Sequence, residues 1–328
     1  MLTAIVICNW EGMIMQPTIT MMVGLAASGK STYAKKLASD TDAIILSSDA
    51  IRWELFGDET DQEHNQQVFQ ELHKRAKKWL KSGRSVVYDA TNINSKRRRA
   101  FLNELKKISC TKECIIMATP YKQCLENNRN RERKVPEWVI ERMYRKWQTP
   151  HTFEGFDKVN IKYWDDEHFV EETDIVNSLL DFDQQNPHHS LTLGEHLLKT
   201  WQICHLNDFN LIDSLDILSA CLVHDCGKPF VKTFTNIKGE TTNIAHYYDH
   251  EHVSAYESLF IQQGVLKEGW DYIAPNIVNV SALVTWHMQP YFFGCNNNEK
   301  LRNKYKKIWG EELYRSIMAL HEADKAAH

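Results

Sequence analysis

Residues 24–32 read Gly-Leu-Ala-Ala-Ser-Gly-Lys-Ser-Thr, a glycine-rich loop that ends in a lysine and two hydroxyl side chains. The spacing G-x-x-x-x-G-K-S lets successive backbone N–H groups surround a phosphate, while Lys30 reaches the β- and γ-phosphates and Ser31 binds Mg²⁺. An apolar run at 18–23 precedes the loop and a helical stretch at 33–38 follows it, as this motif requires. We therefore expect ATP, or another nucleoside triphosphate, to bind with Mg²⁺ at Gly24, Ser28, Gly29, Lys30, Ser31 and Thr32.

A carboxylate and an arginine follow the next predicted strand, at 44–46. Asp49 and Arg52 then lie at the carboxyl end of a parallel strand, where ligands bind in open α/β sheets. Asp49 could accept the proton of an attacking hydroxyl, and Arg52 could hold an acceptor phosphate. Asp49 could equally cap a helix that begins at Ala50. The spacing alone leaves both interpretations open.

Two further predicted strands carry polar groups after their ends. The run at 85–88 leads into Asp89, in the pattern of a Walker-B-like metal or water holder, with Thr91 and Asn92 as expected acceptor-binding residues. A basic run, Lys-Arg-Arg-Arg at 96–99, is typical of a solvated helix face, or else it contacts a polyanion. After the strand at 113–118, arginines gathered before Pro136 suit a mobile lid over a transferring phosphate.

Four segments carry a family resemblance over roughly residues 18–165: GLAASGKST, SSDAIR, YDATNINSKRRR and RNRERKVPEWVIERM. In this order they resemble the P-loop 5′-hydroxyl polynucleotide kinases of phage and bacterial nucleic-acid repair. The resemblance implies that Asp49 is the general base, that Arg52 holds the acceptor's phosphate, and that Arg131 and Arg133 are lid arginines. One departure is Asn127-Asn128, where the family commonly has Arg-Asn; Arg129 is the candidate substitute.

The second half of the chain concentrates histidines and carboxylates. Eleven of the fifteen histidines lie beyond residue 170, and we expect the chain from Thr192 onward to be all helix. Neutral imidazoles and carboxylates together suit divalent transition metals. The candidate ligands, in chain order, are His196, His224, Asp225, His250, His287 and Asp324.

The order H…HD…D, with Gly-Lys after the His-Asp pair, resembles the HD-domain metal phosphohydrolases over about residues 185–328. The resemblance implies a core ligand set of His196, His224, Asp225 and Asp324. It also places His250 and His287 where two-metal members bind a second ion, so we expect one or two ions of Mn²⁺, Ni²⁺, Co²⁺ or Fe²⁺. Lys228 would neutralise phosphate charge, and His189 could reach the same phosphate. A degenerate module that binds without turnover is the alternative.

Length and composition agree with two soluble domains. The chain has 328 residues, 43% of them hydrophobic, which excludes disordered and collagen-like classes. Its net charge of −4 combines +5 up to residue 170 and −9 beyond it. Eight cysteines without a C-x-x-C pair, and no apolar run of membrane-spanning length, predict reduced thiols in a cytoplasmic protein without membrane association.

The predicted fold is an α/β P-loop kinase domain (1–170), a linker (171–187) and an all-α HD domain (188–328). The two resemblances imply an end-healing enzyme that phosphorylates 5′-OH ends of RNA or DNA and removes a 3′-phosphate or 2′,3′-cyclic phosphate, with a nucleic-acid ligase as a downstream partner. The alternatives are a small-molecule kinase fused to an HD nucleotidase, and a nucleotide-sensing binding module.

Overall fold

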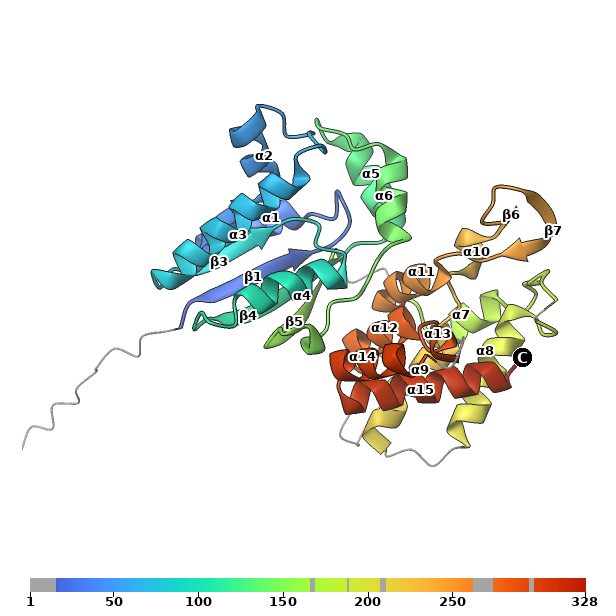
Figure 1. Cartoon of the computed structure of the whole chain (residues 1–328). Coiled ribbons are helices and arrows are strands. Elements are labelled where there is room, and N and C mark those ends of the chain that lie inside the picture. The colour runs from blue at the N-terminus through green and yellow to red at the C-terminus, as the bar shows by residue number, and fades with distance from the viewer. Residues whose placement is uncertain (1–15, 166–168, 188, 207–210, 262–273, 295–297) are drawn as a thin grey trace, which may run out of the picture.

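The computed structural model describes residues 16–165, 169–187, 189–206, 211–261, 274–294 and 298–328. It contains a sheet-based first domain and a largely helical second domain, which lie against each other (Figure 1). The predicted fold class is therefore confirmed. None of the helices in the described part of the chain is long and apolar enough to cross a membrane.

The first domain is built on a parallel five-stranded sheet in the order β2-β3-β1-β4-β5. Its strands are short and apolar, as the sequence predicts: β1 (Thr18–Val23), β2 (Ile44–Ser47), β3 (Val86–Asp89), β4 (Thr111–Ala118) and β5 (Lys158–Tyr163). Because all neighbours are parallel, every carboxyl end meets at the same edge of the sheet. The registers place Asp89 beside Met22 of β1 and beside Ser47 of β2.

Helices cover both faces of this sheet. They are α1 (Lys30–Thr41), α2 (Ser48–Phe56), α3 (Asn65–Lys81), α4 (Ser95–Glu104), α5 (Tyr121–Asn130), α6 (Glu137–Tyr144) and the 3₁₀ turn η1 (Thr152–Glu154). Side chains alternate along a strand, so Met22 packs with α1 on one face while Met21 and Val23 join the larger core on the other. That larger core also takes in buried residues of α3 and α4.

The second domain is a bundle of helices with one small hairpin. The helices are α7 (Glu172–Ser178), α8 (Leu193–His205), α9 (Leu211–Val223), α10 (Lys228–Val231), α11 (His250–Glu257), η2 (Ser258–Phe260), α12 (Ile277–Trp286), α13 (Tyr291–Gly294), α14 (Glu299–Trp309) and α15 (Glu311–Ala326). The expectation that this region is all helix is wrong at one place. Strands β6 (Thr233–Thr235) and β7 (Thr241–His246) form an antiparallel hairpin, because threonines at 233, 235, 241 and 242 favour strand and Gly239 supplies the turn with φ of +83°.

The segment predicted as a linker is partly packed. Residues 172–178 form α7, which packs against α8 and α9, and Val176 and Leu179 are buried. One continuous core of buried residues runs from the sheet of the first domain through α6 into α11, α12 and α15. The two domains therefore share an apolar interior.

Candidate active sites

The glycine-rich loop joins the carboxyl end of β1 to the first residue of α1. Gly29 has a φ of +84°, a left-handed conformation that a glycine adopts without strain. Lys30 is buried, and its Nζ donates to the Leu25 carbonyl and lies 3.4 Å from Ser28 Oγ. Burial lowers the pKa of Lys30 to about 8. The loop thus holds an ammonium group and free backbone donors at a helix N-terminus, which suits an anionic phosphate.

Asp89 ends β3 next to this loop. Burial raises the pKa of Asp89, although a hydrogen bond from Ser31 and the nearby Lys30 ammonium act in the opposite direction. Lys30, Ser31 and Asp89 are therefore brought together, and a hydroxyl beside a carboxylate is a donor pair that fits Mg²⁺.

Thr91 and Asn92, for which we predicted acceptor binding, hydrogen-bond to β1 and to the start of the phosphate loop, and their role toward an acceptor stays a prediction. The carbonyl of Thr91 accepts from the Gly24 N–H at 3.1 Å. The Asn92 amide donates to the Met22 carbonyl at 2.8 Å, and Asn92 has a φ of +50°. Both residues fasten the start of the phosphate loop to the neighbouring strand.

Asp49 lies in the first turn of α2, directly after β2. Its side chain is 48% exposed, so an acceptor can reach it. Arg52 donates to one carboxylate oxygen at 2.8 Å, and Arg133 donates to the other at 2.6 Å. The N-cap of α2 is Ser47, so Asp49 lies within the helix and is not its N-cap residue. The arrangement suits a reacting carboxylate between two guanidinium groups.

Asn128 holds the segment between α5 and α6, which we predicted to be a lid, through hydrogen bonds to it. Its Oδ1 accepts from Val135 N at 2.9 Å and from Arg131 Nε at 3.1 Å. Arg131 Nη2 is buried without a hydrogen-bond partner among the described residues, and burial lowers the pKa of Arg131. Arg129, by contrast, forms an exposed ion pair with Glu137 at 2.7 Å. Arg131 and Arg133 are therefore brought to the site, and Arg129 is not.

All six predicted ligands of the second domain meet in one buried cluster. Within one group, His196 Nε2 lies 3.3 Å from His224 Nε2 and 3.2 Å from Asp324 Oδ1. In a second group, Asp225 Oδ1 lies 3.0 Å from His250 Nε2 and 3.6 Å from His287 Nε2. Within each group the ligand atoms all lie within 4.8 Å of one another. The other oxygen of Asp225 lies 3.6 Å from both His196 and His224, so Asp225 bridges the groups.

Backbone carbonyls orient three of these imidazoles. The Nδ1 atoms of His224, His250 and His287 lie 2.8–3.0 Å from the carbonyls three residues earlier. A proton on Nδ1 leaves the Nε2 lone pair for a metal ion, the usual second-sphere arrangement. His287 Nε2 is buried with no hydrogen-bond partner in the described chain. Four imidazoles and two carboxylates arranged in this way fit two divalent transition metal ions.

Local structure explains why these side chains converge. Thr192 and Glu195 form a capping box that starts α8 one turn before His196. A Cβ atom on Gly227 would lie 2.6 Å from Ser254 N, so only glycine lets the chain after Asp225 approach α11 this closely. That approach brings Asp225 to His250, which is the first residue of α11.

Lys228 is buried beside the cluster. Its Nζ lies 2.6 Å from Asp225 Oδ2, donates to Gln184 Oε1 at 2.8 Å and lies 3.4 Å from His189 Nε2. Burial alone would raise the pKa of Asp225, but the Lys228 ammonium and the neighbouring imidazoles hold it well below its usual range. Asp225 is therefore a carboxylate, the form that binds metal.

Comparisons with known proteins concern mainly the first domain. Residues 19–150 match the family model AAA_33, an AAA domain. The L-seryl-tRNA(Sec) kinase of Methanococcus maripaludis is 29% identical over 176 residues, which cover 51% of this chain and 66%, just under two thirds, of that relative.

Solved structures give weaker likenesses. A protein from Chloroflexus aurantiacus J-10-fl, described as a kinase, has 19% identity and a TM-score of 0.39 over 50% of this chain and 93% of its own. A chain of the Pnkp1/Rnl/Hen1 complex has 15% identity and a TM-score of 0.33 over 58% of this chain and 66% of its own.

The family match, the phosphate loop and its parallel sheet coincide on the same residues. The first domain is a P-loop kinase domain. ATP binding by this kinase domain follows from its family and from the Lys30, Ser31 and Asp89 arrangement.

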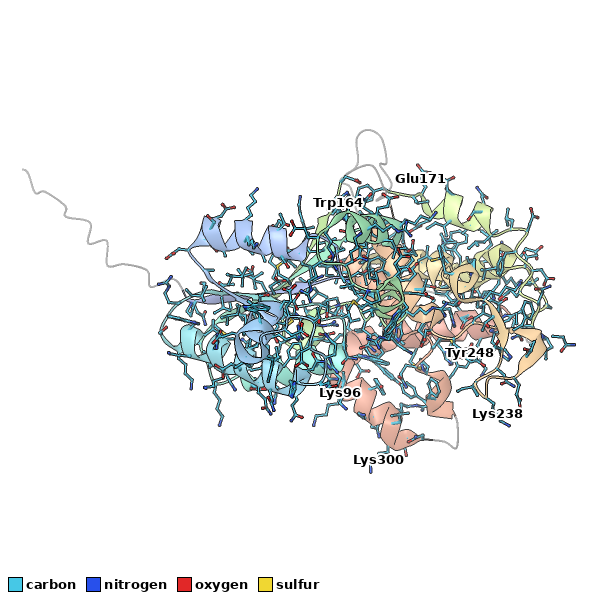
Figure 2. The ribbon with its side chains drawn as sticks, turned by 90° about the horizontal axis from the view of Figure 1, so that it is seen from above. Lys96, Trp164, Glu171, Lys238, Tyr248 and Lys300 are labelled. Atoms are coloured by element: carbon cyan, nitrogen blue, oxygen red, sulfur yellow. The ribbon has the colours of Figure 1, made fainter. Side chains whose placement is uncertain are left out.

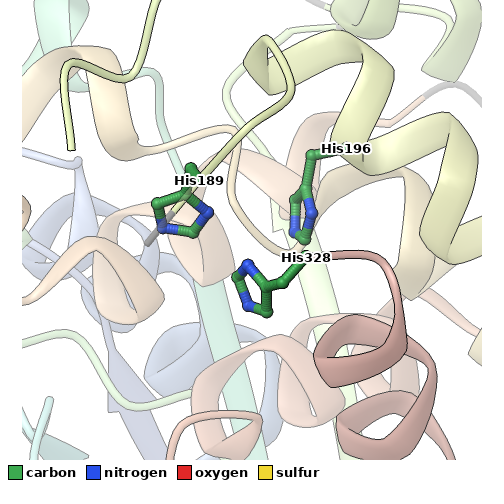
Figure 3. Close-up of side chains that lie close together, drawn as sticks. All are labelled: His189, His196 and His328. Carbon is green, nitrogen blue, oxygen red and sulfur yellow. The ribbon is translucent and has the colours of Figure 1, made fainter. Parts of the chain in front are cut away.

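The sequence did not indicate two residues that lie beside the six candidate metal ligands, His328 and Tyr291. The ring of His328 stacks on that of His196 with centroids 5.1 Å apart and lies 4.6 Å from the ring of His189, so the three form a further group (Figure 3). Tyr291 donates to Asp324 Oδ2 at 2.9 Å. His328 follows Asp324 by four residues, a short separation that could have revealed it, and it lies just beyond the end of α15. Tyr291 has no such signal in the sequence.

The kinase domain contacts the second domain through α6 and the segment that follows α6. Tyr144 donates to Glu257 at 2.5 Å, and Lys146 pairs with Asp249 at 2.5 Å. Tyr256 donates to the Thr119 carbonyl at 2.5 Å, and the fully buried Trp147 packs edge-on against its ring. Asp249 immediately precedes His250, so the segment after α6 is tied to the start of α11, the helix that begins with a candidate metal ligand.

Proposed function

We propose that this protein is a bifunctional nucleic-acid end-healing enzyme. Its kinase domain transfers the γ-phosphate of ATP to a 5′-OH end, and its second domain removes a 3′-phosphate or opens a 2′,3′-cyclic phosphate. The observation that carries the proposal is Asp49, a half-exposed carboxylate between Arg52 and Arg133 at the edge of the sheet that holds the phosphate loop.

The roles of the kinase residues follow from this geometry. Asp49 accepts the proton of the attacking hydroxyl, and Arg52 holds the phosphate next to that hydroxyl. Arg131 and Arg133 supply positive charge to the transferring phosphate. Arg133 now contacts Asp49, so its movement to the donor phosphate frees one carboxylate oxygen for the acceptor. Ser31 and Asp89 are the residues that would hold Mg²⁺, which would neutralise the charge of the donor phosphates.

A polynucleotide acceptor is favoured over a metabolite by charge and by motif order. The stretch from Lys74 to Lys112 contains thirteen lysines and arginines and only two acids, Asp89 and Glu104. The motif order resembles that of polynucleotide kinases. The relative from Methanococcus maripaludis is also named for an acceptor carried on RNA. A small-molecule kinase would not need this charge, and a nucleotide-sensing module would need neither this charge nor a carboxylate base.

The second domain supplies a phosphohydrolase-type site. His196, His224, Asp225 and Asp324 would hold one divalent ion, and Asp225, His250 and His287 a second. Such ions would activate water and clamp a phosphate oxygen. Lys228 balances the charge of the phosphate, and His189, 3.4 Å from Lys228 Nζ, contacts the same group. The two activities belong together because nucleases that leave 5′-OH ends leave phosphate on the other strand end. A ligase would then join the healed ends.

One substrate tests both activities. Purified protein is incubated with ATP, Mg²⁺ or Mn²⁺, and an oligoribonucleotide bearing a 5′-OH and a 2′,3′-cyclic phosphate, and each end is followed separately. We expect Asp49→Asn to lower 5′ phosphorylation by at least about 100-fold, the usual contribution of a general base, while 3′ processing persists. Asp225→Asn should do the reverse, and Asp40→Asn, an exposed carboxylate on α1, should change neither.

Each half of the proposal can fail separately. A 3′ end that stays unchanged with every divalent ion would remove the phosphohydrolase. A higher kcat/KM for free nucleosides than for oligonucleotides would favour the small-molecule kinase.

A further inference from the structure

A large groove lies between the two domains, apart from both candidate sites. Its volume is about 1120 Å³, and it is lined by α4 and η1 of the kinase domain and by α12, α13 and α14 of the second domain. Its lining contains no residue of the phosphate loop, no lid arginine and none of the six candidate metal ligands. Figure 2 shows Lys96 at the start of α4 and Lys300 at the start of α14, where the two domains approach each other. The volume exceeds the roughly 300–1,000 Å³ usual for small-molecule pockets.

Both walls of the groove carry stripes of positive charge. Lys96, Arg99 and Lys106 line it from α4 and the turn after it, with spacings of three and seven residues that keep them on one side. Lys304 and Lys307 line it from α14, again three residues apart. Among the described residues, no carboxylate forms an ion pair with Lys96, Arg99, Lys106, Lys304 or Lys307, and four of these five cations are exposed.

The carboxylates of the lining do not neutralise these cations. The side chain of Glu154 is fully buried and accepts two hydrogen bonds from Arg98, both at 2.6 Å. Glu251 is turned to the histidines, with its carboxylate 3.7 Å from His250 Nδ1. The basic run at 96–99 is thus divided by helix geometry, because Arg98 serves the core while Lys96 and Arg99 face the groove.

Aromatic rings alternate with the cations. Phe153, Trp286, Phe292 and Tyr305 line the groove, and Phe292 is 57% exposed. Lys304 Nζ lies 5.6 Å from the centroid of the Tyr305 ring. The exposed part of the Phe292 ring is free to contact a ligand in the groove. Positive charge that tracks a backbone, beside rings that accept bases, is the combination by which proteins bind single-stranded nucleic acid.

We propose that this α4–α14 groove is a binding site for single-stranded polynucleotide. Phosphates contact Lys96, Arg99, Lys106, Lys304 and Lys307, and bases stack on the exposed ring of Phe292 and its aromatic neighbours. The inference rests on the proposed function for its choice of polyanion. It adds to that function a site, outside both reaction centres, that holds the strand rather than its end.

Binding of an unreactive strand tests the groove. The probe is a labelled single-stranded RNA of about 20 nucleotides with a 5′-phosphate and a 3′-OH, which offers neither proposed reaction a substrate. Affinity is measured by fluorescence anisotropy over a range of salt. We expect Lys304→Glu/Lys307→Glu to weaken binding at least about tenfold and to reduce the slope of log K against log salt by about 1.4, or 0.7 for each lost phosphate contact.

A matched control removes the same charge elsewhere. Lys199→Glu/Lys238→Glu reverses two exposed lysines of the second domain, on α8 and in the β6–β7 turn, outside the groove lining, and should leave both affinity and slope close to wild type. Phe292→Ala should weaken binding roughly fivefold or more without changing the slope, because stacking is lost and charge is not. Equal thermal unfolding midpoints for all variants establish that each is folded.

Three results would overturn the inference: equal weakening by the two charge reversals, preference for a duplex over the single strand, or tighter binding of an acidic peptide of the same charge. Failure here and failure of the proposed function are distinguishable. Strand binding that depends on Lys304 and Lys307 without any phosphate transfer would overturn the kinase proposal alone. Phosphate transfer together with unaltered binding by the Lys304→Glu/Lys307→Glu variant would overturn the groove alone.

Discussion

Glu257 is a partly buried acid at the contact between the two domains. It lies between the domains and accepts a hydrogen bond from Tyr144. Burial raises the pKa of Glu257, and the Tyr144 hydroxyl only partly opposes this. A carboxyl whose pKa is raised on folding binds its proton more tightly in the folded state, so its ionisation destabilises the fold as pH rises above the ordinary glutamate value.

We therefore predict that Glu257→Gln is more stable than the wild type at pH 8 and that this advantage shrinks as pH falls toward 5. The glutamine oxygen can still accept from Tyr144, while the cost of burying a charge is removed. Thermal unfolding midpoints measured across this pH range check the prediction, with the exposed Glu126→Gln as a control that shows no such trend. An unfolding midpoint of the wild type that rises relative to that of Glu257→Gln as pH rises would contradict the prediction.

At the level of single residues, the sequence predicted side chains whose chemistry is set by motif spacing. Lys30, Ser31 and Asp89 come together as expected, as do His224, Asp225 and the other candidate ligands. The acceptor-binding role of Thr91 and Asn92 stays a prediction, because their hydrogen bonds to the phosphate loop and to β1 involve no acceptor. Tyr291 was missed because only the fold brings α13 next to α15.

At the level of elements, α4 is held by a buried ion pair. Arg98 donates to Glu154 twice, and also to the carbonyls of Asn92 and Gln148 at 2.7 and 2.8 Å. The pair connects α4 to η1, the two kinase-domain elements of the groove wall. Removing one partner would leave a buried charge without compensation.

We predict that Arg98→Met lowers the free energy of unfolding by about 3–5 kcal/mol, while the exposed neighbour Arg97→Met changes it by less than about 0.5 kcal/mol. The double variant Arg98→Met/Glu154→Leu should recover part of the loss, because the unpaired carboxylate is gone but two carbonyls stay without donors. Urea denaturation measures all three variants. Full additivity of the two substitutions would show that the pair is not coupled.

Element type followed from the sequence where the apolar pattern was strong, as in the strands of the sheet. The prediction of element type failed at the β6–β7 hairpin, because its threonine-rich strands are exposed and carry little apolar pattern. Within the predicted linker, a few apolar residues of an acidic stretch pack α7 against its neighbours. In both places tertiary contacts, rather than local pattern, decide the structure.

At the level of the whole molecule, the shared core should make the two domains unfold together. Trp147 belongs to the kinase domain, yet it is fully buried against Tyr256 of the second domain, with ring centroids 5.0 Å apart. Loss of this ring would leave a cavity that both domains line.

We predict that Trp147→Ala costs about 3–5 kcal/mol and shifts a single thermal transition of the entire protein. Trp138→Ala is the matched control, since Trp138 is 61% exposed on the adjacent helix α6 and its removal should change little. Calorimetry decides the question. Two separate transitions, of which only one responds to Trp147→Ala, would contradict the shared core.

The hydrogen bond from Tyr256 to the Thr119 carbonyl joins the two domains and therefore limits which substitutions the sequence can accept during evolution. Each half supplies part of the other half's interior, so neither can be exchanged for an unrelated unit without exposing apolar surface. Substitutions near Thr119, Trp147 and Tyr256 are then accepted only in compatible pairs. We therefore expect the kinase half and the helical half to be inherited as one block, in this order, rather than as interchangeable modules.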